Sequence, residues 1–156
     1  MEDKIKIMSL KFKLILVRHA DYDGNGVDPE VSEQGIQQAK KLAGKIKQEI
    51  VGSNTVIWTS PALRAQGTTQ AMKEELQLVN EVKVLEKLWS DNKHKEDYHW
   101  LLNELQSLEL DGTLIIVSHL EYVRVFPIYL GFTRNEAGYT EGVVVDKDII
   151  KKISYR

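Results

Sequence analysis

Two short apolar runs, about a hundred residues apart, both end in a histidine, and this repetition constrains the fold more than any other feature of the chain. The first occupies residues 14–20 (LILVRHA) and the second residues 114–119 (LIIVSH). Both are rich in β-branched residues and lack the alternation of a half-exposed strand, which is typical of a fully buried central strand of a parallel sheet. Open α/β sheets place their ligand crevice at the carboxyl ends of such strands. We therefore expect His19 and His119 to belong to one site.

Composition narrows the classes of protein to which the chain can belong. Its 156 residues, 42% of them hydrophobic, suffice for one domain with one core. The net charge of −2, with both signs dispersed, argues against nucleic acid or an anionic membrane surface as a partner. The absence of cysteine excludes disulfides, thiolate catalysis and cysteine-ligated metal sites.

The N-terminal residues predict an extension and no targeting signal. Residues 1–8 (MEDKIKIM) mix acids and bases before any apolar stretch, unlike a signal peptide. No apolar segment approaches the roughly 18 to 20 residues that span a bilayer. We expect a cytoplasmic protein with an extension over residues 1–10 and one domain over residues 11–156.

Strand and helix patterns alternate along the chain. A glycine- and aspartate-rich loop leads to Ser32, the expected N-cap of a helix over residues 33–48. Ser60 and Pro61 are typical of the start of a second helix, with Ser60 as its cap. Further strands are predicted at residues 55–59 and 82–85, helices at residues 97–108 and 122–130, and a closing hairpin at residues 142–155. This order predicts an α/β three-layer sandwich with a mostly parallel central sheet flanked by helices.

Four side chains would converge if the strands that precede them are neighbours: Arg18, His19, Arg64 and His119. Two arginines and two histidines describe an anion site, and a guanidinium binds phosphate oxygens through two parallel hydrogen bonds without losing its charge. Because histidine titrates near neutrality, one imidazole can stay neutral as a nucleophile while the other stays protonated to balance charge in the transition state. A phosphoryl group is the expected ligand.

Three blocks of the chain resemble the histidine phosphatase superfamily, which includes the phosphoglycerate mutases. The family's strand-Arg-His-Gly motif corresponds to residues 16–20 (LVRHA), with Ala20 in place of the glycine, and is followed by residues 31–39 (VSEQGIQQA). The Ser-Pro-x-x-Arg-Ala-x-x-Thr motif corresponds to residues 60–68, and the last block to residues 116–119 (IVSH). The resemblance implies the phosphoglycerate mutase-like fold in a minimal version with few insertions.

The resemblance also implies roles for individual residues. His19 is implied to be the residue that is phosphorylated, Arg18 and Arg64 the phosphate clamp, and His119 the second histidine in contact with phosphate. The general acid stays open between Glu86, Asp21 and neither. Asp21 and Ser60 are further candidates for substrate binding, although Ser60 could serve only as a helix cap.

The small size and the Ser118-His119-Leu120 ending resemble the SixA-type phosphohistidine phosphatases. The implied function is a hydrolase without cofactor that acts on a phosphorylated protein and releases inorganic phosphate. The alternatives are a small-metabolite phosphomonoesterase, a phosphoglycerate mutase-like enzyme, and an inactive module that binds phosphorylated partners.

Other conspicuous side chains favour simpler interpretations. His94 and His99 lack the one-turn spacing of a helical metal pair, and no metal site is predicted. Ser118 is expected to be structural and Trp58 to lie in the core. Trp89 and Trp100 could belong either to the core or to the rim of the pocket.

Overall fold

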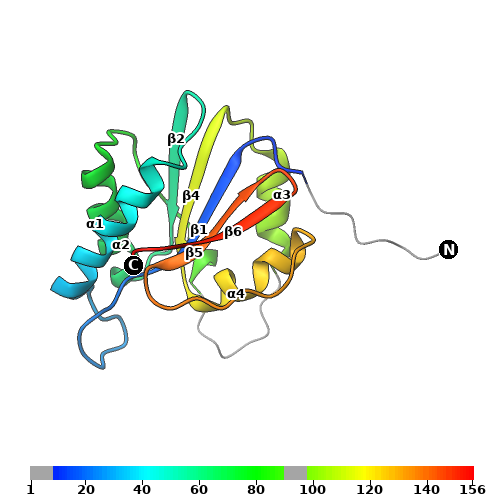
Figure 1. Cartoon of the computed structure of the whole chain (residues 1–156). Coiled ribbons are helices and arrows are strands. Elements are labelled where there is room, and N and C mark those ends of the chain that lie inside the picture. The colour runs from blue at the N-terminus through cyan, green and yellow to red at the C-terminus, as the bar shows by residue number, and fades with distance from the viewer. Residues whose placement is uncertain (1–8, 90–97) are drawn as a thin grey trace.

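The computed structural model describes residues 9–89 and 98–156, in which six strands form one central sheet. The strands are β1 (Lys13–Arg18), β2 (Asn54–Thr59), β3 (Lys83–Val84), β4 (Gly112–Ser118), β5 (Glu141–Asp146) and β6 (Ile149–Ser154), and the helices are α1 (Glu33–Lys47), α2 (Leu63–Leu76), the 3₁₀ helix η1 (Glu86–Leu88), α3 (His99–Ser107) and α4 (Leu120–Tyr129). The strand order is β3-β2-β4-β1-β5-β6. Helices α1 and α2 cover one face and α3 and α4 the other (Figure 1). The predicted three-layer α/β sandwich is confirmed.

The two apolar runs that end in histidine form the centre of the sheet. All residues of β4 are buried, as are the four interior residues of β1. The strands pair in parallel with Arg18 opposite Ser118, and the backbone N–H of His19 donates to the carbonyl of Ser118 over 2.9 Å. Strand β2 pairs with the other side of β4, also in parallel. Three neighbouring strands therefore present their carboxyl ends at one edge.

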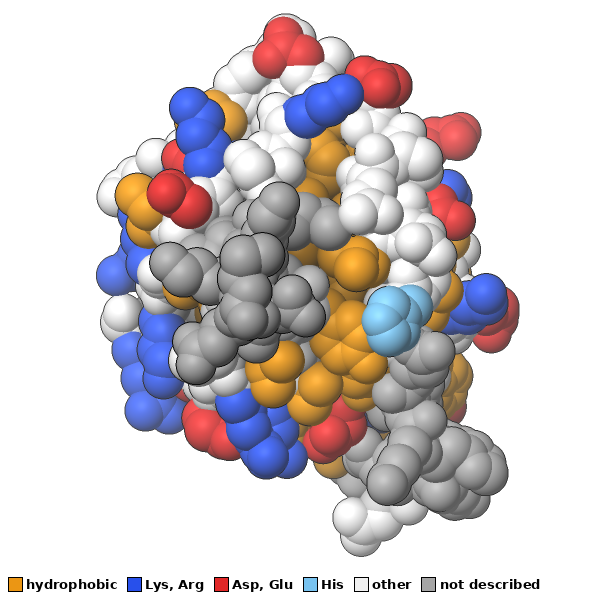
Figure 2. Space-filling view, turned by 90° about the vertical axis from the view of Figure 1, so that its right-hand side faces the viewer, with side chains coloured by type: hydrophobic (Ala, Val, Ile, Leu, Met, Phe, Trp, Pro, Cys, Tyr) orange, Lys and Arg blue, Asp and Glu red, His pale blue; other side chains and the backbone are white. Residues whose placement is uncertain are grey.

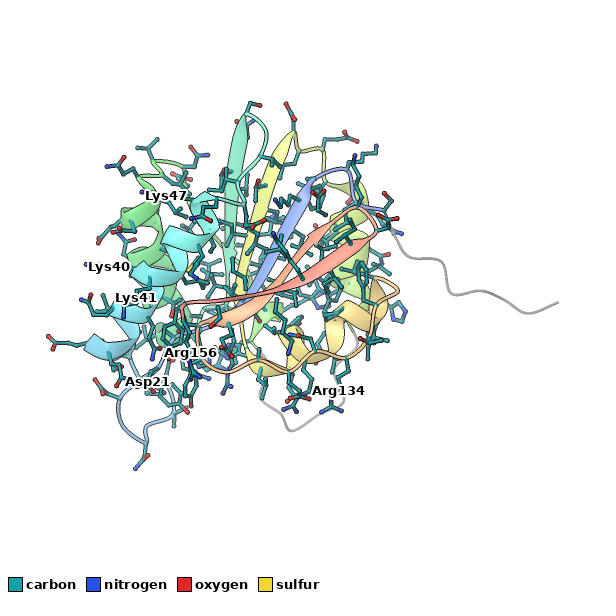
Figure 3. All side chains as sticks on the ribbon, in the orientation of Figure 1. Asp21, Lys40, Lys41, Lys47, Arg134 and Arg156 are labelled. Atoms are coloured by element: carbon teal, nitrogen blue, oxygen red, sulfur yellow. The ribbon has the colours of Figure 1, made fainter. Side chains whose placement is uncertain are left out.

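Helix α1 follows its predicted boundaries within one residue. The Ser32 side chain caps it by accepting the backbone N–H of Gly35 over 2.9 Å. The inner face packs on the sheet through apolar side chains, whereas Lys40, Lys41 and Lys47 project from the outer face (Figure 3). This division is the amphipathic pattern from which the helix was predicted.

The prediction that Ser60 caps the second helix is wrong. Helix α2 begins at Leu63, and its N-cap residue, Ala62, makes no side-chain capping bond. The N–H of Leu63 instead donates to the carboxylate of Asp28 over 2.9 Å. The hydroxyl of Ser60 accepts the N–H of Ala62 and hydrogen-bonds to His119. The first turn of α2 is therefore capped by the Asp28 carboxylate, which comes from the loop after β1, and not by Ser60.

The other differences from the predicted elements are small. Helix α4 begins at Leu120, two residues before the predicted start. The helix predicted over residues 97–108 is α3, which spans His99–Ser107, and residue 97 lies outside the described part of the chain. The hairpin of β5 and β6 lies where it was predicted. Leu10, the last residue of the predicted extension, is buried in the core, and residues 1–8 lie outside the described residues.

Apolar side chains pack on both faces of the sheet. Trp58 is buried between the sheet and the α3 and α4 layer, as predicted. Hydrophobic side chains gather on the side of the molecule that carries α3 and α4 (Figure 2). Across residues 9–89 and 98–156, no helix combines the length and apolar character needed to cross a bilayer.

Two glycines are expected to respond in opposite ways to replacement by alanine. At Gly142, in β5, a Cβ atom would lie 1.9 Å from the carbonyl oxygen of Leu16. Because that atom is backbone, Gly142→Ala should lower the free energy of unfolding by about 1–3 kcal/mol. Gly44 is exposed on α1, and a Cβ there would contact nothing within 4 Å. Gly44→Ala should therefore raise stability by about 0.5–1 kcal/mol. Urea denaturation of both variants measures the difference, and a stable Gly142→Ala protein would contradict the close packing of β1 on β5.

Candidate active site

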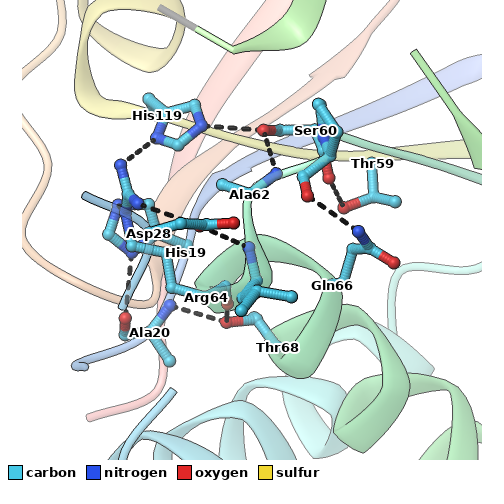
Figure 4. Close-up of polar contacts among 12 residues, drawn as sticks. His19, Ala20, Asp28, Thr59, Ser60, Ala62, Arg64, Gln66, Thr68 and His119 are labelled. Carbon is cyan, nitrogen blue, oxygen red and sulfur yellow. Dashed lines mark hydrogen bonds and ion pairs between the residues drawn. The ribbon is translucent and has the colours of Figure 1, made fainter. Parts of the chain in front are cut away.

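The structure brings Arg18, His19, Arg64 and His119 together at the carboxyl ends of β1, β2 and β4. Arg18 ends β1, and His19 follows it. His119 is the N-cap residue of α4, and Arg64 lies in the first turn of α2. The two imidazole centroids are 5.1 Å apart. Arg64 bridges the two rings, with its Nε 3.3 Å from Nε2 of His19 and its Nη2 3.4 Å from Nδ1 of His119 (Figure 4).

The hydrogen bonds of His19 fix its tautomer. Nδ1 lies 2.9 Å from the carbonyl oxygen of Ala20, and because a carbonyl only accepts, Nδ1 carries the proton. Nε2 then keeps its lone pair and faces the donor Nε of Arg64. The N–H of Ala20 donates to Thr68 Oγ1 over 2.8 Å. Ala20 is not among the described residues with positive φ, so alanine replaces the family's glycine here without strain.

His119 is held in the complementary way. Nη2 of Arg64 can only donate, so Nδ1 of His119 accepts, and Nε2–H donates to the hydroxyl of Ser60 over 2.8 Å. Ser60 thus orients an imidazole, a role that the sequence did not indicate. The Nδ1 lone pair of His119 and the Nε2 lone pair of His19 both face the guanidinium of Arg64.

Both imidazoles are neutral in the free site. Burial, together with the charges of Arg64 and Arg18, lowers the pKa of His19 to about 4. Burial and the nearby His19 and arginines lower the pKa of His119 to about 3. Both pKa values are low because the rings are buried and because two guanidinium groups lie beside them. The expectation that one imidazole is protonated concerns the transition state, and it stays a prediction.

Arg18 offers a donor to an anion. Its Nη1 donates to the carbonyl of Ala137 over 3.1 Å, and its guanidinium lies 4.2 Å from the ring centroid of Tyr139. Its Nε–H is buried and has no hydrogen-bond partner within the described residues. Burial lowers the pKa of Arg18, yet arginine stays charged in proteins. A buried charged donor without a partner favours the binding of an oxyanion.

Asp28 belongs to the site although the sequence analysis did not single it out. Its Oδ1 lies 3.9 Å from Nη1 of Arg64 and accepts the N–H of Leu63. The carboxylate therefore both starts α2 and orients the arginine of the first turn. Its only sequence signal is a loop composition that many surface aspartates share.

The two candidate acids, Glu86 and Asp21, have different surroundings. Glu86 is exposed on η1 and borders a hollow with Lys83 and Trp100. Asp21 lies beside the site, but its Oδ2 accepts the hydroxyl of Ser32 at 3.4 Å. In the described part of the chain, neither carboxylate makes a hydrogen bond or ion pair with His19 or His119.

The other residues singled out in the sequence either stabilise the fold or lie at the edge of the site. The Ser118 hydroxyl donates to the carbonyl of Leu88 over 2.7 Å, which ties β4 to η1 and fits its predicted structural role. Trp89 stacks on His119 at the rim of the site, whereas the indole N–H of Trp100 donates to Tyr122 in the α3 and α4 layer. The ring of His99 packs against the tyrosine at the end of α4, and His94 lies outside the described residues.

Two tyrosines at the site escaped the sequence analysis. The ring of Tyr22 lies 5.6 Å and that of Tyr139 5.8 Å from the imidazole of His19. Tyr22 follows β1 and Tyr139 precedes β5, so neither belongs to a strand whose carboxyl end marks the crevice. Single tyrosines in loops carry no pattern that reveals such a contact.

The titration of the two histidines should respond to an oxyanion. In the free protein we expect His19 and His119 to titrate near pH 4 and pH 3, because burial and the arginines oppose protonation. Inorganic phosphate should raise both pKa values, since a nearby dianion favours the imidazolium. Imidazole NMR shifts measured with phosphate, and with sodium chloride at equal ionic strength as a control, test this. A histidine of the free site that titrates near 6.5 would contradict it.

The same pKa values predict a loss of stability in acid. Unfolded histidine binds a proton near pH 6.5, but these folded histidines bind one only near pH 4 or below. The unfolded state therefore binds more protons between these values, and each histidine should reduce the free energy of unfolding by up to about 1.4 kcal/mol per pH unit as the pH falls from 6.5 to 4. Denaturation of the wild type and of His119→Asn measures this slope, which should be shallower in the variant. An equal slope in both proteins would sink the prediction.

Comparisons with known proteins agree with this geometry. The sequence model of the histidine phosphatase superfamily (branch 1) matches residues 14–89. Phosphoserine phosphatase 1 of Hydrogenobacter thermophilus is 32% identical over 133 residues, which are 73% of this chain and 62% of that protein. The chain thus spans less than two thirds of the length of this relative.

Solved structures share the fold at lower sequence identity. The protein histidine phosphatase SixA in complex with tungstate superposes with a TM-score of 0.74 at 20% identity, covering 92% of this chain and 97% of that one. A phosphoserine phosphatase of Entamoeba histolytica in complex with phosphoserine has a TM-score of 0.63 at 19% identity, covering 93% and 98%. From the matched blocks, the fold and the convergence of Arg18, His19, Arg64 and His119, we conclude that the chain belongs to the histidine phosphatase superfamily.

Proposed function

We propose that the chain is a phosphatase that transfers a phosphoryl group to Nε2 of His19 and then to water. The observation that carries the proposal is the state of His19: its Nδ1–H is engaged by a backbone carbonyl, and its neutral Nε2 faces the clamp of positive charge. A nucleophile must keep its lone pair at working pH. A pKa of about 4 keeps that lone pair unprotonated near neutrality.

The reaction would proceed in two displacements. In the first, the Nε2 lone pair of His19 attacks phosphorus, the bond between phosphorus and the leaving atom breaks, and the leaving atom keeps that electron pair and takes up a proton. In the second, water attacks the phosphorus of the phosphohistidine, the P–N bond breaks, and its electron pair returns to Nε2. Water loses a proton and inorganic phosphate departs.

Positioning and charge stabilisation would supply the catalysis, as in other phosphoryl transfers. The buried Nε–H of Arg18 and the guanidinium of Arg64 would donate to the equatorial oxygens of a group on His19. A bound dianion raises the pKa of His119, so that its Nδ1 changes from acceptor to donor as the phosphoryl group arrives. The substrate itself would then bring about the protonated second histidine that the sequence led us to expect.

The placement of the acids favours a phosphohistidine-bearing protein as substrate. Glu86 is exposed, and Asp21 is hydrogen-bonded to Ser32. An alkoxide leaving group needs a positioned acid. The nitrogen of an imidazole can instead be protonated before its bond to phosphorus breaks. The fold similarity to the protein histidine phosphatase SixA is consistent with this choice.

A phosphomonoester such as phosphoserine is the second candidate. It is favoured by the 32% identity to a phosphoserine phosphatase. For this substrate a proton donor would be required, and Asp21 is the nearer of the two candidate carboxylates in sequence to His19. The two candidate substrates therefore differ in whether turnover requires a carboxylic acid to protonate the leaving group.

Turnover by three variants separates these possibilities. With a phosphohistidine protein as substrate, His19→Ala should lower kcat/KM about a thousandfold or more, because the nucleophile is lost. Glu86→Gln and Asp21→Asn should each stay within about threefold of the wild type, because an imidazole leaving group needs no positioned acid. Release of phosphate from the phosphohistidine protein, phosphoserine and an aryl phosphate is the measurement.

Each contrary outcome has its own meaning. A large loss in Asp21→Asn with phosphoserine, together with weak turnover of phosphohistidine, would favour the second candidate. Phosphate release that survives in His19→Ala would refute the covalent route. The chain would be a binding module if it bound the phosphorylated protein, showed no turnover, and formed no ³²P-labelled phosphoenzyme.

A further inference from the structure

Three partly exposed aromatic side chains from three separate segments surround the two histidines. Tyr22 lies in the loop after β1, Trp89 directly after η1, and Tyr139 in the segment before β5. The rings of Tyr22 and Tyr139 lie against His19, at 5.6 and 5.8 Å between centroids. The indole of Trp89 instead stacks on His119, 6.1 Å away and inclined by 19°. We call these three side chains the aromatic wall.

The wall also contacts the phosphate clamp. The guanidinium of Arg18 lies 4.2 Å from the ring centroid of Tyr139. That of Arg64 lies between Tyr22 and Trp89, at 5.4 and 5.7 Å from their centroids. Each cationic donor for a phosphoryl oxygen is thus next to a ring. A phosphoryl group on the arginines would leave its substituent beside apolar surface.

The polar atoms of the wall are largely occupied. The hydroxyls of Tyr22 and Tyr139 hydrogen-bond, and this bond adds to burial in raising the pKa of Tyr139. Their rings meet edge to face at 5.7 Å. What the wall presents to a substrate is therefore mainly ring surface, which a flat unsaturated group covers better than an aliphatic one.

In-line transfer directs the leaving group toward Trp89. The leaving atom lies on the side of phosphorus opposite the attacking Nε2 of His19. Tyr22 and Tyr139 flank His19 itself, whereas Trp89 contacts His119 and Arg64. Trp89 is consequently the ring best placed to stack on a departing group.

We propose that the aromatic wall, and Trp89 above all, makes the site selective for phosphoryl groups bonded directly to a planar ring, of which the imidazole of phosphohistidine is one. This inference rests on the proposed phosphatase function and specifies its leaving group. It assigns Trp89 to substrate specificity and predicts discrimination against phosphoryl groups on saturated carbon. Stacking of one ring accounts for a preference of about five- to tenfold.

Two phosphonates test the proposal without any chemical step. Phenylphosphonate and cyclohexylphosphonate have similar size and the same charge when fully ionised, but only the first is planar. Calorimetry at a pH where both are dianions should give a wild-type Kd about five- to tenfold lower for phenylphosphonate. The preference should disappear in Trp89→Leu and persist in Trp89→Phe, which keeps a ring. Trp100→Leu is the matched control, since that indole bonds to Tyr122 away from the site, and it should keep the preference.

Inorganic phosphate, which has no leaving group, separates the competing explanations. Its affinity should change little in Trp89→Leu. If phosphate and both phosphonates weaken by the same factor, Trp89 only orients Arg64 and the proposal is overturned. Equal wild-type affinity for the two phosphonates also overturns it. A ring preference in a protein that turns over no phosphorylated substrate would support the wall and refute the proposed phosphatase function, so the two failures are distinguishable.

Discussion

The parallel register of β1 against β4 is the constraint on which the rest of the structure depends. Pairing of Arg18 with Ser118 places the next residue of each strand, a histidine in both, at the same level of the sheet edge. The bond from the N–H of His19 to the carbonyl of Ser118 extends this register by one residue beyond β1. A slip of one residue would turn every side chain of a strand to the opposite face of the sheet. The burial of both strands makes such a slip costly, so the core fixes the geometry of the site.

Charge and burial oppose each other at this edge. Two arginines and two histidines lie together in a largely buried position, and the protein keeps both imidazoles neutral. Asp28 is the carboxylate in contact with Arg64, at 3.9 Å, and the Nε–H of Arg18 is buried without a partner in the described part of the chain. A site with unused buried donors is less stable alone than with an anion bound. This arrangement readies the site for an oxyanion.

The proposed specificity for the leaving group comes from loop segments outside the central sheet. The aromatic wall is built from the loop after β1, the end of η1 and the residues before β5. Backbone hydrogen bonds attach the last of these segments to the end of β1: the N–H of Thr140 donates to the carbonyls of Arg18 and His19, both at 3.2 Å. Thr140 adopts a positive φ of 60°, which is uncommon for threonine and turns the chain next to Tyr139. The shared fold therefore positions the arginines of the clamp, and the loops position the aromatic wall beside them.

The sequence by itself determined the layers, the order of the elements and the four side chains that converge at the carboxyl ends of the central strands. Buried strands and amphipathic helices leave periodic patterns, and the family's motifs keep Arg18, His19, Arg64 and His119 in fixed local contexts. Only the tertiary structure decided that Asp28 caps α2 in place of Ser60, that Ser60 orients His119, and that Tyr22, Trp89 and Tyr139 surround the histidines. These contacts join residues distant in the chain through single side chains. Because no local periodicity records such a contact, it appears only when the packed sheet brings the segments together.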